Sequence, residues 1–387
     1  MRFSNSTLQL VLLTTLLLCQ IPALAIKKSY VVYLGSHAHG PHLSEADLHA
    51  VTNTHHASLG SFLGSTKKAR DAIFYFYTRH INGFAAVLEE EEAVEIARHP
   101  KVLSVFENQA KKLHTTHSWD FMLLEKNGAI HPNSIWKKAR FGEDTIIANL
   151  DTGVWPESKS FSDEGYGPVP SRWKGTCQNN VGIPCNRKLI GARYFNKAFI
   201  AYNEGFGIDL AGNATYNSGR DYEGHGSHTL STAGDSFVEG VNVLGQGNGT
   251  AKGGSPRARV ATYKVCWPHV VGDGECFDAD ILQAFDTAIH DGVDVISLSV
   301  GGDPADYFND GIAIGSFHAV KHGIVVVSSA GNSGPSPGTV SNVAPWMLTV
   351  GASTIDRDFQ AIVQLQNGKQ LKVHTTYKIH YLLQYFQ

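Results

Sequence analysis

From residue 144 onward, short apolar runs alternate with segments of helical periodicity, and this alternation restricts the fold more than any other feature of the chain. The apolar runs span 144–150, 260–265, 293–300 and 324–328. The clearest helical segments span 280–290 and 311–322. Strands that stay apolar along their whole length are typical of a parallel sheet covered by helices on both faces. The sequence therefore predicts an α/β domain, with functional groups expected at the carboxyl ends of the strands.

A different pattern occupies residues 26–114. Strands are predicted over 30–34, 73–77, 83–88 and 102–106. The dipeptide Asn82-Gly83 is expected in the turn between the middle two. One helix is expected after Ser44, whose side chain begins a capping box, and a shorter one precedes the last strand. The order β-α-β-β-α-β is that of a ferredoxin-like α+β domain, and the polar stretch 108–116 is predicted to be a linker.

The first 25 residues match an export signal. Arg2 precedes an apolar run over 8–18, and Ala23-Leu24-Ala25 forms a small-residue cleavage site. A membrane anchor is the alternative, but the run is shorter than the ~20 residues that a spanning helix needs. We therefore expect a signal peptide at 1–25 and a secreted, extracellular product.

Export makes the five cysteines informative, because disulfides persist in oxidising compartments. Cys19 lies in the signal, and the other four form two local pairs, Cys177 with Cys185 and Cys266 with Cys276. We expect two disulfides, although four cysteines permit three pairings. A zinc site is the alternative, but the C-x2-C spacing typical of such sites is missing from the sequence.

Two sequons, at Asn213 and Asn248, are predicted to be glycosylated on surface loops of an exported protein. A third match, at Asn5, lies in the signal and is discounted.

Composition narrows the class of protein. Hydrophobic residues make up 42% and charged residues 17% of the 387, which indicates a globular chain long enough for two or three domains. The net charge is only −3, and no run of lysine or arginine stands out. Nucleic acid is therefore not expected as a partner.

Three polar residues stand where chemistry is expected in such a fold. Asp151 ends the first apolar run, His225 lies between two glycines at a predicted helix start, and Asn332 lies in a glycine-rich turn after the last run. A carboxylate can hold one ring nitrogen of a histidine so that the other acts as a base, and a turn amide can donate to an oxyanion. Taken singly, each has an ordinary alternative: a capping aspartate, a structural histidine or a metal pair with His228, and a turn asparagine.

Taken together, these motifs resemble those of the S8 subtilisin-like serine proteases, whose catalytic residues follow the chain order Asp, His, Ser. Longer matches are similar to the plant members of that family; they lie at 115–121, 151–158, 185–192, 263–267 and 280–284. The resemblance implies a subtilisin-like sheet in 115–387, preceded by an inhibitor I9-type propeptide at 26–114 that is removed near His114. It implies protein or peptide substrates and the propeptide as an intramolecular inhibitor. We expect no cofactor, and the sequence assigns no metal site.

The resemblance also implies roles for individual residues. Asp151 would orient His225 and stabilise its imidazolium, and His225 would act as general base and then as general acid. Asn332 would be the oxyanion-hole donor. The segment Ser299-Val300-Gly301-Gly302 would form the edge on which an extended peptide adds as a strand.

The chain departs from the family pattern in two places. The family serine lies in a Gly-Thr-Ser-Met context, and none of the three Gly-Thr pairs in this sequence is followed by serine. From about residue 369 the sequence no longer resembles the family. We therefore expect a truncated precursor that does not itself turn over peptides, because loss of the serine alone lowers kcat by about 2 × 10⁶ in subtilisin. The alternative is a non-catalytic inhibitor or folding chaperone of other subtilases, built on residues 26–114.

Overall fold

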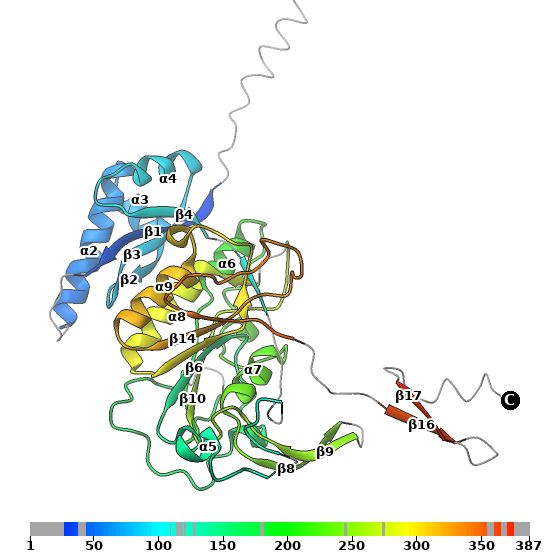
Figure 1. Ribbon diagram of the computed structural model, residues 1–387. Helices are drawn as coiled ribbons and strands as arrows, with labels where there is room; N and C mark the ends of the chain where they lie inside the picture. The colour runs from blue at the N-terminus through cyan, green and yellow to red at the C-terminus, as the bar shows by residue number, and fades with distance from the viewer. Residues whose placement is uncertain are drawn as a thin grey trace, which may run out of the picture.

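The computed structural model describes residues 27–37, 44–108, 110–113, 119, 121–126, 129–178, 182–243, 246–272, 275–353, 360–364 and 370–374 (Figure 1). The expected signal peptide at 1–25 and the expected cleavage site at His114 lie outside these residues. Within the described part of the chain, no helix is both long enough and apolar enough to cross a membrane.

A six-stranded parallel sheet forms the centre of the larger domain (Figure 1). In spatial order its strands are β15 (Leu348–Val350), β14 (Val325–Ser329), β12 (Val295–Leu298), β6 (Ile146–Asp151), β10 (Arg259–Lys264) and β7 (Leu189–Tyr194). Every residue of β6 and β10 is buried, as expected for central strands covered on both faces. The predicted parallel sheet is confirmed.

The sequence predicts the strands of this sheet incompletely. The apolar run 293–300 is not one strand: it divides at Ser299 into β12 and β13 (Val300–Gly301), and β13 belongs to a separate three-stranded sheet. The sequence does not indicate β15, because three residues are too few for a periodic signal. Nor does it indicate β7, which contains a glycine and an arginine.

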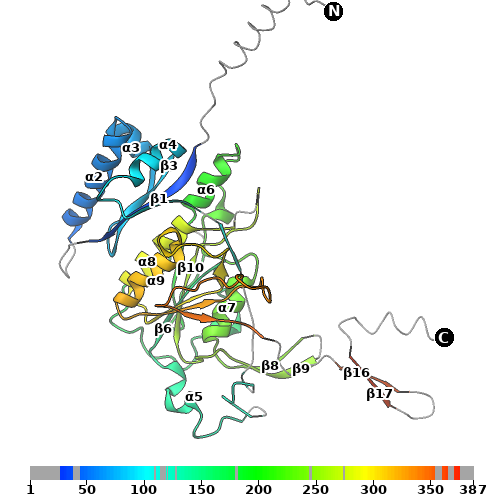
Figure 2. The same ribbon diagram turned by 45° about the horizontal axis from the view of Figure 1, so that its top comes forward.

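Helices cover the two faces of the sheet (Figure 2). α8 (Asp278–Asp291) and α9 (Gly311–Lys321) pack on one face, and α7 (His225–Gly234) packs against β6 and β10 on the other. Gly315 of α9 lets the first two helices lie close together, because a Cβ there would be 2.3 Å from the ring of Phe285 on α8. As predicted, α8 ends at Gly292, which has a φ of 85°.

The N-terminal domain has its own antiparallel sheet, in the order β2, β3, β1, β4. The strands are Lys28–Ser36 (β1), Ile73–Tyr77 (β2), Ile81–Leu88 (β3) and Ser104–Glu107 (β4), and the helices are Glu45–Phe62 (α2), Thr66–Ala72 (α3) and Glu90–Ala97 (α4). The predicted order is confirmed, with the capping box at Ser44, but α3 is additional. α3 buries only Ala69, so it has no apolar periodicity that would reveal it.

The predicted turn at Asn82-Gly83 is wrong. Both residues lie within β3, and the chain reverses at 78–80 instead. Gly83 is needed inside the strand, because a Cβ there would lie 2.3 Å from the carbonyl oxygen of Val32. Asn82 uses its Oδ1 to hold the buried ring of His55, whose Nε2 is 2.9 Å away. The Asn-Gly pair therefore reflects packing inside the domain.

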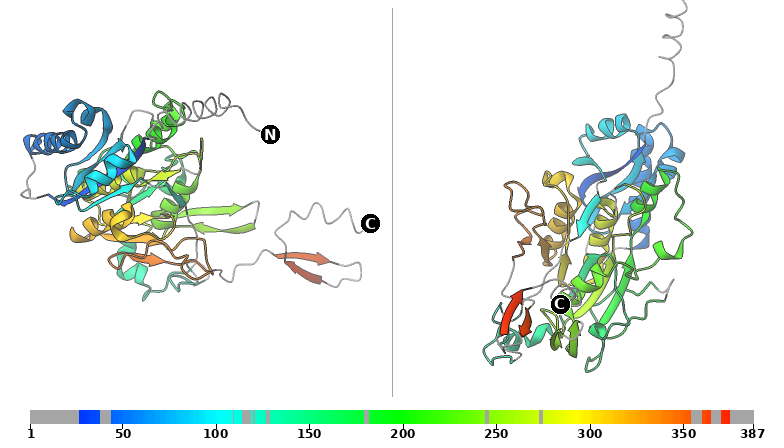
Figure 3. Two further views of the ribbon diagram at one scale, coloured as in Figure 1. Left: turned by 90° about the horizontal axis from the view of Figure 1, so that it is seen from above. Right: turned by 90° about the vertical axis from the view of Figure 1, so that its right-hand side faces the viewer.

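Alternate residues of β1 face two different cores. Tyr30 and Val32 pack with Leu59 of α2 in the core of the N-terminal domain. Val31 and Tyr33 point the other way and join the core of the larger domain. The second face of the N-terminal sheet is thus covered by α8 and by α6 (Lys197–Glu204), and Tyr33 reaches His318 of α9. The two domains, which lie side by side in Figure 3, share a continuous apolar core.

The predicted linker at 108–116 is structured where it is described. Asn108 is buried, and its Oδ1 accepts a hydrogen bond of 2.7 Å from the backbone N–H of Ala279 in α8. Residues Ala110–Leu113 form β5, which pairs antiparallel with β11 (Cys276–Phe277) on one side and with β13 on the other. A polar segment can be a strand when two neighbours satisfy its backbone, and composition alone does not reveal this.

Shorter elements complete the described structure: α5 (Ile135–Lys138), α6 (Lys197–Glu204), β8 (Val238–Val243), β9 (Gln246–Ala251), β16 (Gln360–Gln364), β17 (Gln370–His374) and single 3-10 turns at Arg140–Gly142, Lys159–Phe161, Ala214–Tyr216 and Tyr307–Asn309. Figure 3 shows the hairpin β8–β9 projecting from the larger domain and the hairpin β16–β17 standing apart from it.

The contact between the domains is expected to weaken in acid through His318 of α9. Its buried Nε2 lies 2.8 Å from the hydroxyl of Tyr33, and burial lowers the pKa of His318 from 6.5 to about 4. Between these values the unfolded chain holds a proton that the folded chain lacks, so this group reduces stability by about 1.4 kcal/mol for each unit that the pH falls. In His318→Gln, the unfolding free energy from denaturant titrations should therefore depend less on pH between about 4 and 6.5.

The exposed His49 of α2 provides the control, and His49→Gln should keep the pH dependence of the original chain. The buried carboxyls Asp280 and Asp286, whose pKa values burial raises to about 7 and about 6, stabilise the folded chain as pH falls. Because they are present in all three proteins, they cancel in the comparison. An undiminished slope in His318→Gln would contradict the role assigned to His318.

Candidate functional site

Asp151 ends the central strand β6 and is fully buried. Its Oδ1 accepts a hydrogen bond from the N–H of Thr152 and lies 2.7 Å from Nδ1 of His225. Its Oδ2 accepts a hydrogen bond of 2.9 Å from the hydroxyl of Thr229. A buried carboxylate without donors is strongly unfavourable. These three contacts therefore fix the carboxylate in one orientation, with one oxygen facing His225.

His225 is the first residue of α7, as predicted. The preceding Gly224 has a φ of 94°, a conformation that other residues adopt only with strain. Gly226 lets the helix approach the Asp151 loop, because a Cβ there would lie 2.5 Å from the carbonyl oxygen of Gly153. Because a carboxylate only accepts hydrogen bonds, Nδ1 carries the proton and Nε2 keeps its lone pair. Such an imidazole can accept a proton from a bound group.

Thr229 and Asn149 support the pair from beneath, and the sequence analysis identifies neither. Thr229 lies one helical turn after His225, and its hydroxyl is 3.1 Å from Nδ2 of the buried Asn149. The i, i+4 spacing from His225 on a predicted helix is a signal that points to Thr229, since such residues share a helix face. Asn149 occupies a position inside a buried strand, where the sequence pattern gives no sign of its partner.

Asn332 lies in the turn after β14, as predicted, and its side chain is exposed. It lines a pocket of about 220 Å³ at the carboxyl ends of β12, β14 and β15. The other polar residues of the lining are Thr229, Thr232, Ser297, Ser299, Ser328 and Ser329. Asn332 is therefore on the same edge of the sheet as the Asp151–His225 pair, and α7 borders both.

The segment expected to bind a peptide is already paired with another strand of the same chain. β13 pairs with residues 112–113 of β5, and Ser299 and Gly302 flank it. On the other side of β5 lies β11. An extended segment is thus bound on this edge by strand addition, which is the mode that the sequence predicts for a peptide.

The four remaining cysteines form the two local disulfides, Cys177–Cys185 and Cys266–Cys276. The zinc alternative is therefore wrong. The second disulfide bears on the site, because the N–H of Cys266 donates to the carbonyl oxygen of Asp151 and Cys276 lies in β11. It links the strand that carries Asp151 to a wall of the β5 channel. Among the described residues, no group of three histidine, cysteine, aspartate or glutamate side chains is arranged to hold a metal ion.

The two predicted glycosylation sites differ in their setting. Asn213 is exposed at the start of a 3-10 turn, and its Oδ1 accepts a hydrogen bond from the N–H of Thr215. Asn248 lies in β9 of a hairpin, so its predicted loop position is wrong.

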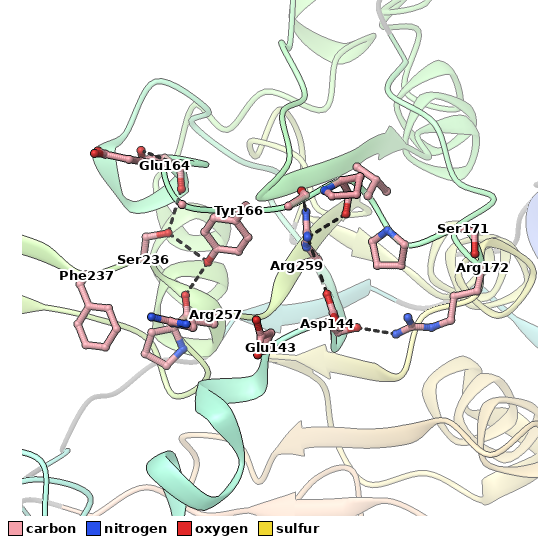
Figure 4. Close-up of a pocket in the computed structure, with 17 residues that line it drawn as sticks. Glu143, Asp144, Glu164, Tyr166, Ser171, Arg172, Ser236, Phe237, Arg257 and Arg259 are labelled. Carbon is pink, nitrogen blue, oxygen red and sulfur yellow. Dashed lines mark hydrogen bonds and ion pairs between the residues drawn. The ribbon is translucent and has the colours of Figure 1, made fainter.

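A larger pocket, of about 930 Å³, lies at the opposite edge of the sheet (Figure 4). Its residues include Asp144, just before β6, and Arg259, the first residue of β10. Within the lining, Arg259 forms an ion pair of 3.8 Å with Asp144, and Arg172 pairs with Asp294 just outside it. It lies at the amino ends of the strands, away from Asp151 and His225, so the smaller pocket at the carboxyl ends is the better candidate for chemistry.

A parallel sheet with a buried Asp–His pair at its carboxyl edge, beside a strand that holds an extended segment, has the acid–base arrangement of serine-type peptide hydrolases. Comparison with known families agrees. The model of the subtilase family matches residues 142–381, and that of peptidase inhibitor I9 matches residues 29–114. The chain belongs to the subtilase family.

Plant proteins are among the curated relatives of this chain. Subtilisin-like proteases SBT5.4 and SBT5.3 of Arabidopsis thaliana are 66% and 64% identical over 95% and 89% of this chain. The matches cover 46% and 44% of those proteins, so the chain spans less than half the length of either. The crystal structure of fervidolysin from Fervidobacterium pennivorans aligns over 82% of this chain and 41% of its own, with 14% identity and a TM-score of 0.44, which is too distant to support a conclusion.

Gly226→Ala is expected to disrupt the Asp–His pair. The new Cβ would lie 2.5 Å from the carbonyl oxygen of Gly153 and 2.9 Å from the nitrogen of Thr152, so α7 must move away from β6. Such overpacking costs about 1–3 kcal/mol, and denaturant unfolding of the whole chain should show a loss in this range. Gly212→Ala is the control, because its Cβ would meet no atom within 4 Å. Equal losses in the two variants would contradict the close approach.

Proposed function

We propose that this chain carries the acid–base machinery of a secreted serine endopeptidase. The observation that supports it most directly is the 2.7 Å contact between Nδ1 of His225 and the buried carboxylate of Asp151. In this proposal Asp151 orients the imidazole and stabilises its charged form. Asn332, at the same edge, donates its side-chain N–H to the oxyanion of the tetrahedral intermediate.

The proton follows one route through the reaction. His225 Nε2 takes the proton of a serine hydroxyl as that oxygen attacks the peptide carbonyl, and then gives it to the leaving amine. Water enters next: the same nitrogen takes a proton from it as the water attacks the acyl carbonyl, and returns that proton to the serine oxygen as the acyl group leaves as a carboxylic acid. We assign no residue of this chain as the serine nucleophile.

Export and processing belong to the same proposal. Residues 1–25 would direct the chain out of the cell, where Asn213 and Asn248 would be glycosylated. Two disulfides are what an oxidising compartment permits, and this supports an extracellular location. Residues 26–114 would be the propeptide, cleaved near His114, and 115–387 would belong to the peptidase domain.

The test of the proposed function is hydrolysis of a quenched fluorescent peptide. The 387-residue chain should show no turnover, and a longer product of the same gene that adds a serine in a Gly-Thr-Ser-Met context should be active. His225→Ala should reduce kcat of that product by at least about 10⁴-fold, whereas replacement of the exposed His131 should leave it unchanged. An active product that is indifferent to His225→Ala would overturn the proposal.

A second function, inhibition by the N-terminal domain, is favoured by the position of β5. In this account β5 fills the channel between β11 and β13 in which a substrate would bind, so the domain blocks the site from within the chain. The same strand could act on other subtilases in trans.

Separately produced residues 26–114 are expected to inhibit an active plant subtilase in a peptide-cleavage assay. Lys112→Pro should weaken inhibition roughly 10-fold or more, because proline cannot donate to the strand pairing with β13, and a buried group left without its partner costs about 1–3 kcal/mol. Lys112→Ala keeps the donor and should inhibit nearly as well. Equal inhibition by both variants would show that β5 does not bind the channel as proposed.

A further inference from the structure

The buried side chain of Asp221 accepts five hydrogen bonds, although the proposed function gives this residue no role. Its side chain is 3% exposed and lies in the loop before α7. Oδ1 accepts from the hydroxyl of Thr152 at 3.0 Å and from the N–H groups of Glu223 and Gly224 at 3.0 and 2.8 Å. Oδ2 accepts from the N–H and the hydroxyl of Ser227 at 2.8 and 2.7 Å. The carboxylate thus has five donors.

These donors surround the Asp–His pair. Thr152 directly follows Asp151, and Gly224 directly precedes His225. The hydroxyl of Thr152 also accepts from the N–H of Gly226 at 2.7 Å, so two free N–H groups in the first turn of α7, those of residues 226 and 227, are satisfied by Thr152 and Asp221. Asp221 therefore closes a ring of hydrogen bonds that fixes the start of α7 relative to the Asp151 loop.

A buried lysine stands on the other side of Asp221. Lys264 is the last residue of β10 and is paired in register with Asp151 on β6. Its Nζ donates to the carbonyl oxygen of Arg220 at 2.7 Å and lies 4.4 Å from the centre of the Trp267 ring. Burial lowers the pKa of Lys264 to about 8, against the attraction of Asp221 and Glu223. At neutral pH it is therefore mainly a cation.

The opposite charge is kept on Asp221. Burial by itself raises the pKa of this carboxyl, but the hydrogen bonds from Ser227, Gly224 and Glu223 outweigh burial, and the net pKa is lowered. The Asp221 carboxylate and the Lys264 ammonium are thus both buried, and the ammonium binds the carbonyl oxygen of Arg220, the residue just before Asp221. Their charges partly compensate each other, which lowers the cost of burying either.

We propose that Asp221 is a positioning residue for His225, holding the start of α7 against the Asp151 loop with its carboxylate, while Lys264 supplies the compensating charge. The proposal rests on the proposed function in so far as His225 is the acid–base group. In this proposal the two buried charges act on His225 in opposite directions. The negative charge of Asp221 favours the imidazolium form of His225, and the positive charge of Lys264 disfavours it.

Other titratable groups face the same histidine. Asp151 contacts it directly. His228, one turn further along α7, has a pKa that burial and the neighbouring His225 lower. The pKa of Glu223 is raised by burial and by Glu275. None of these is altered in the variants below, so they form a constant background.

The experiment follows the His225 ring by NMR in the full chain labelled with ¹³C and ¹⁵N in histidine, with the signal assigned from its loss in His225→Gln. Asp221→Asn keeps the shape but removes a negative charge, so the pKa of His225 should fall by about 0.5–1 unit. Lys264→Met keeps the apolar stem but removes a positive charge, so the pKa should rise by a similar amount. A purely structural role predicts shifts of one sign, or none, in both variants.

Asp163→Asn is the matched control. Asp163 also accepts from a backbone N–H, that of Arg187, but it lies beside the larger pocket at the other edge of the sheet, and its replacement should not move the titration. If Asp221→Asn does not fold, Lys264→Met decides alone: a rise supports the proposal, and a fall or no shift overturns it. Failure of the peptidase assay would refute the proposed function and leave these opposed shifts unaffected.

Discussion

The burial of the Asp151 carboxylate is the constraint on which the rest of the site depends. A charge at the end of a strand covered on both faces is tolerated only if donors reach it from other elements. Two of those donors come from α7, the ring of His225 and, one helical turn on, the hydroxyl of Thr229. The helix must therefore lie against β6, and the glycine at 226 makes this approach possible. The geometry of the Asp151–His225 pair and the satisfaction of a buried charge are the same requirement here.

The two domains meet through the N-terminal sheet and through β5, which reaches the edge of the larger sheet beside the Asp151–His225 pair. The N-terminal sheet places one face on its own helices and the other on α6 and α8. Its last strand, β4, is followed by Asn108, which binds the first turn of α8, and then by β5, which lies between β11 and β13. Inhibition in the proposed sense is thus a geometric consequence of docking. Cys266–Cys276 links one wall of the channel to the strand of Asp151.

Prediction from the sequence succeeds where the signal is local. The apolar runs give the parallel sheet, the glycines around His225 mark a helix start, and two short cysteine spacings give the observed disulfides. Prediction fails where the conformation of a residue depends on contact with a residue far away in the sequence. Gly83 faces the backbone of Val32 on the neighbouring strand β1, and the polar segment at 110–113 becomes a strand through partners more than 150 residues away.

The sequence by itself determined the types of element, the ends of β6 and α7 at which Asp151 and His225 stand, and the membership of the chain in its family. Only the tertiary structure decided that Thr229 and Asn149 support the carboxylate, that Asp221 and Lys264 are both buried near it, and that β5 occupies the channel. The physical reason is range. Periodicity, turns and caps depend on residues within a few positions, whereas burial and the partners of buried polar groups depend on which distant segments the fold brings together.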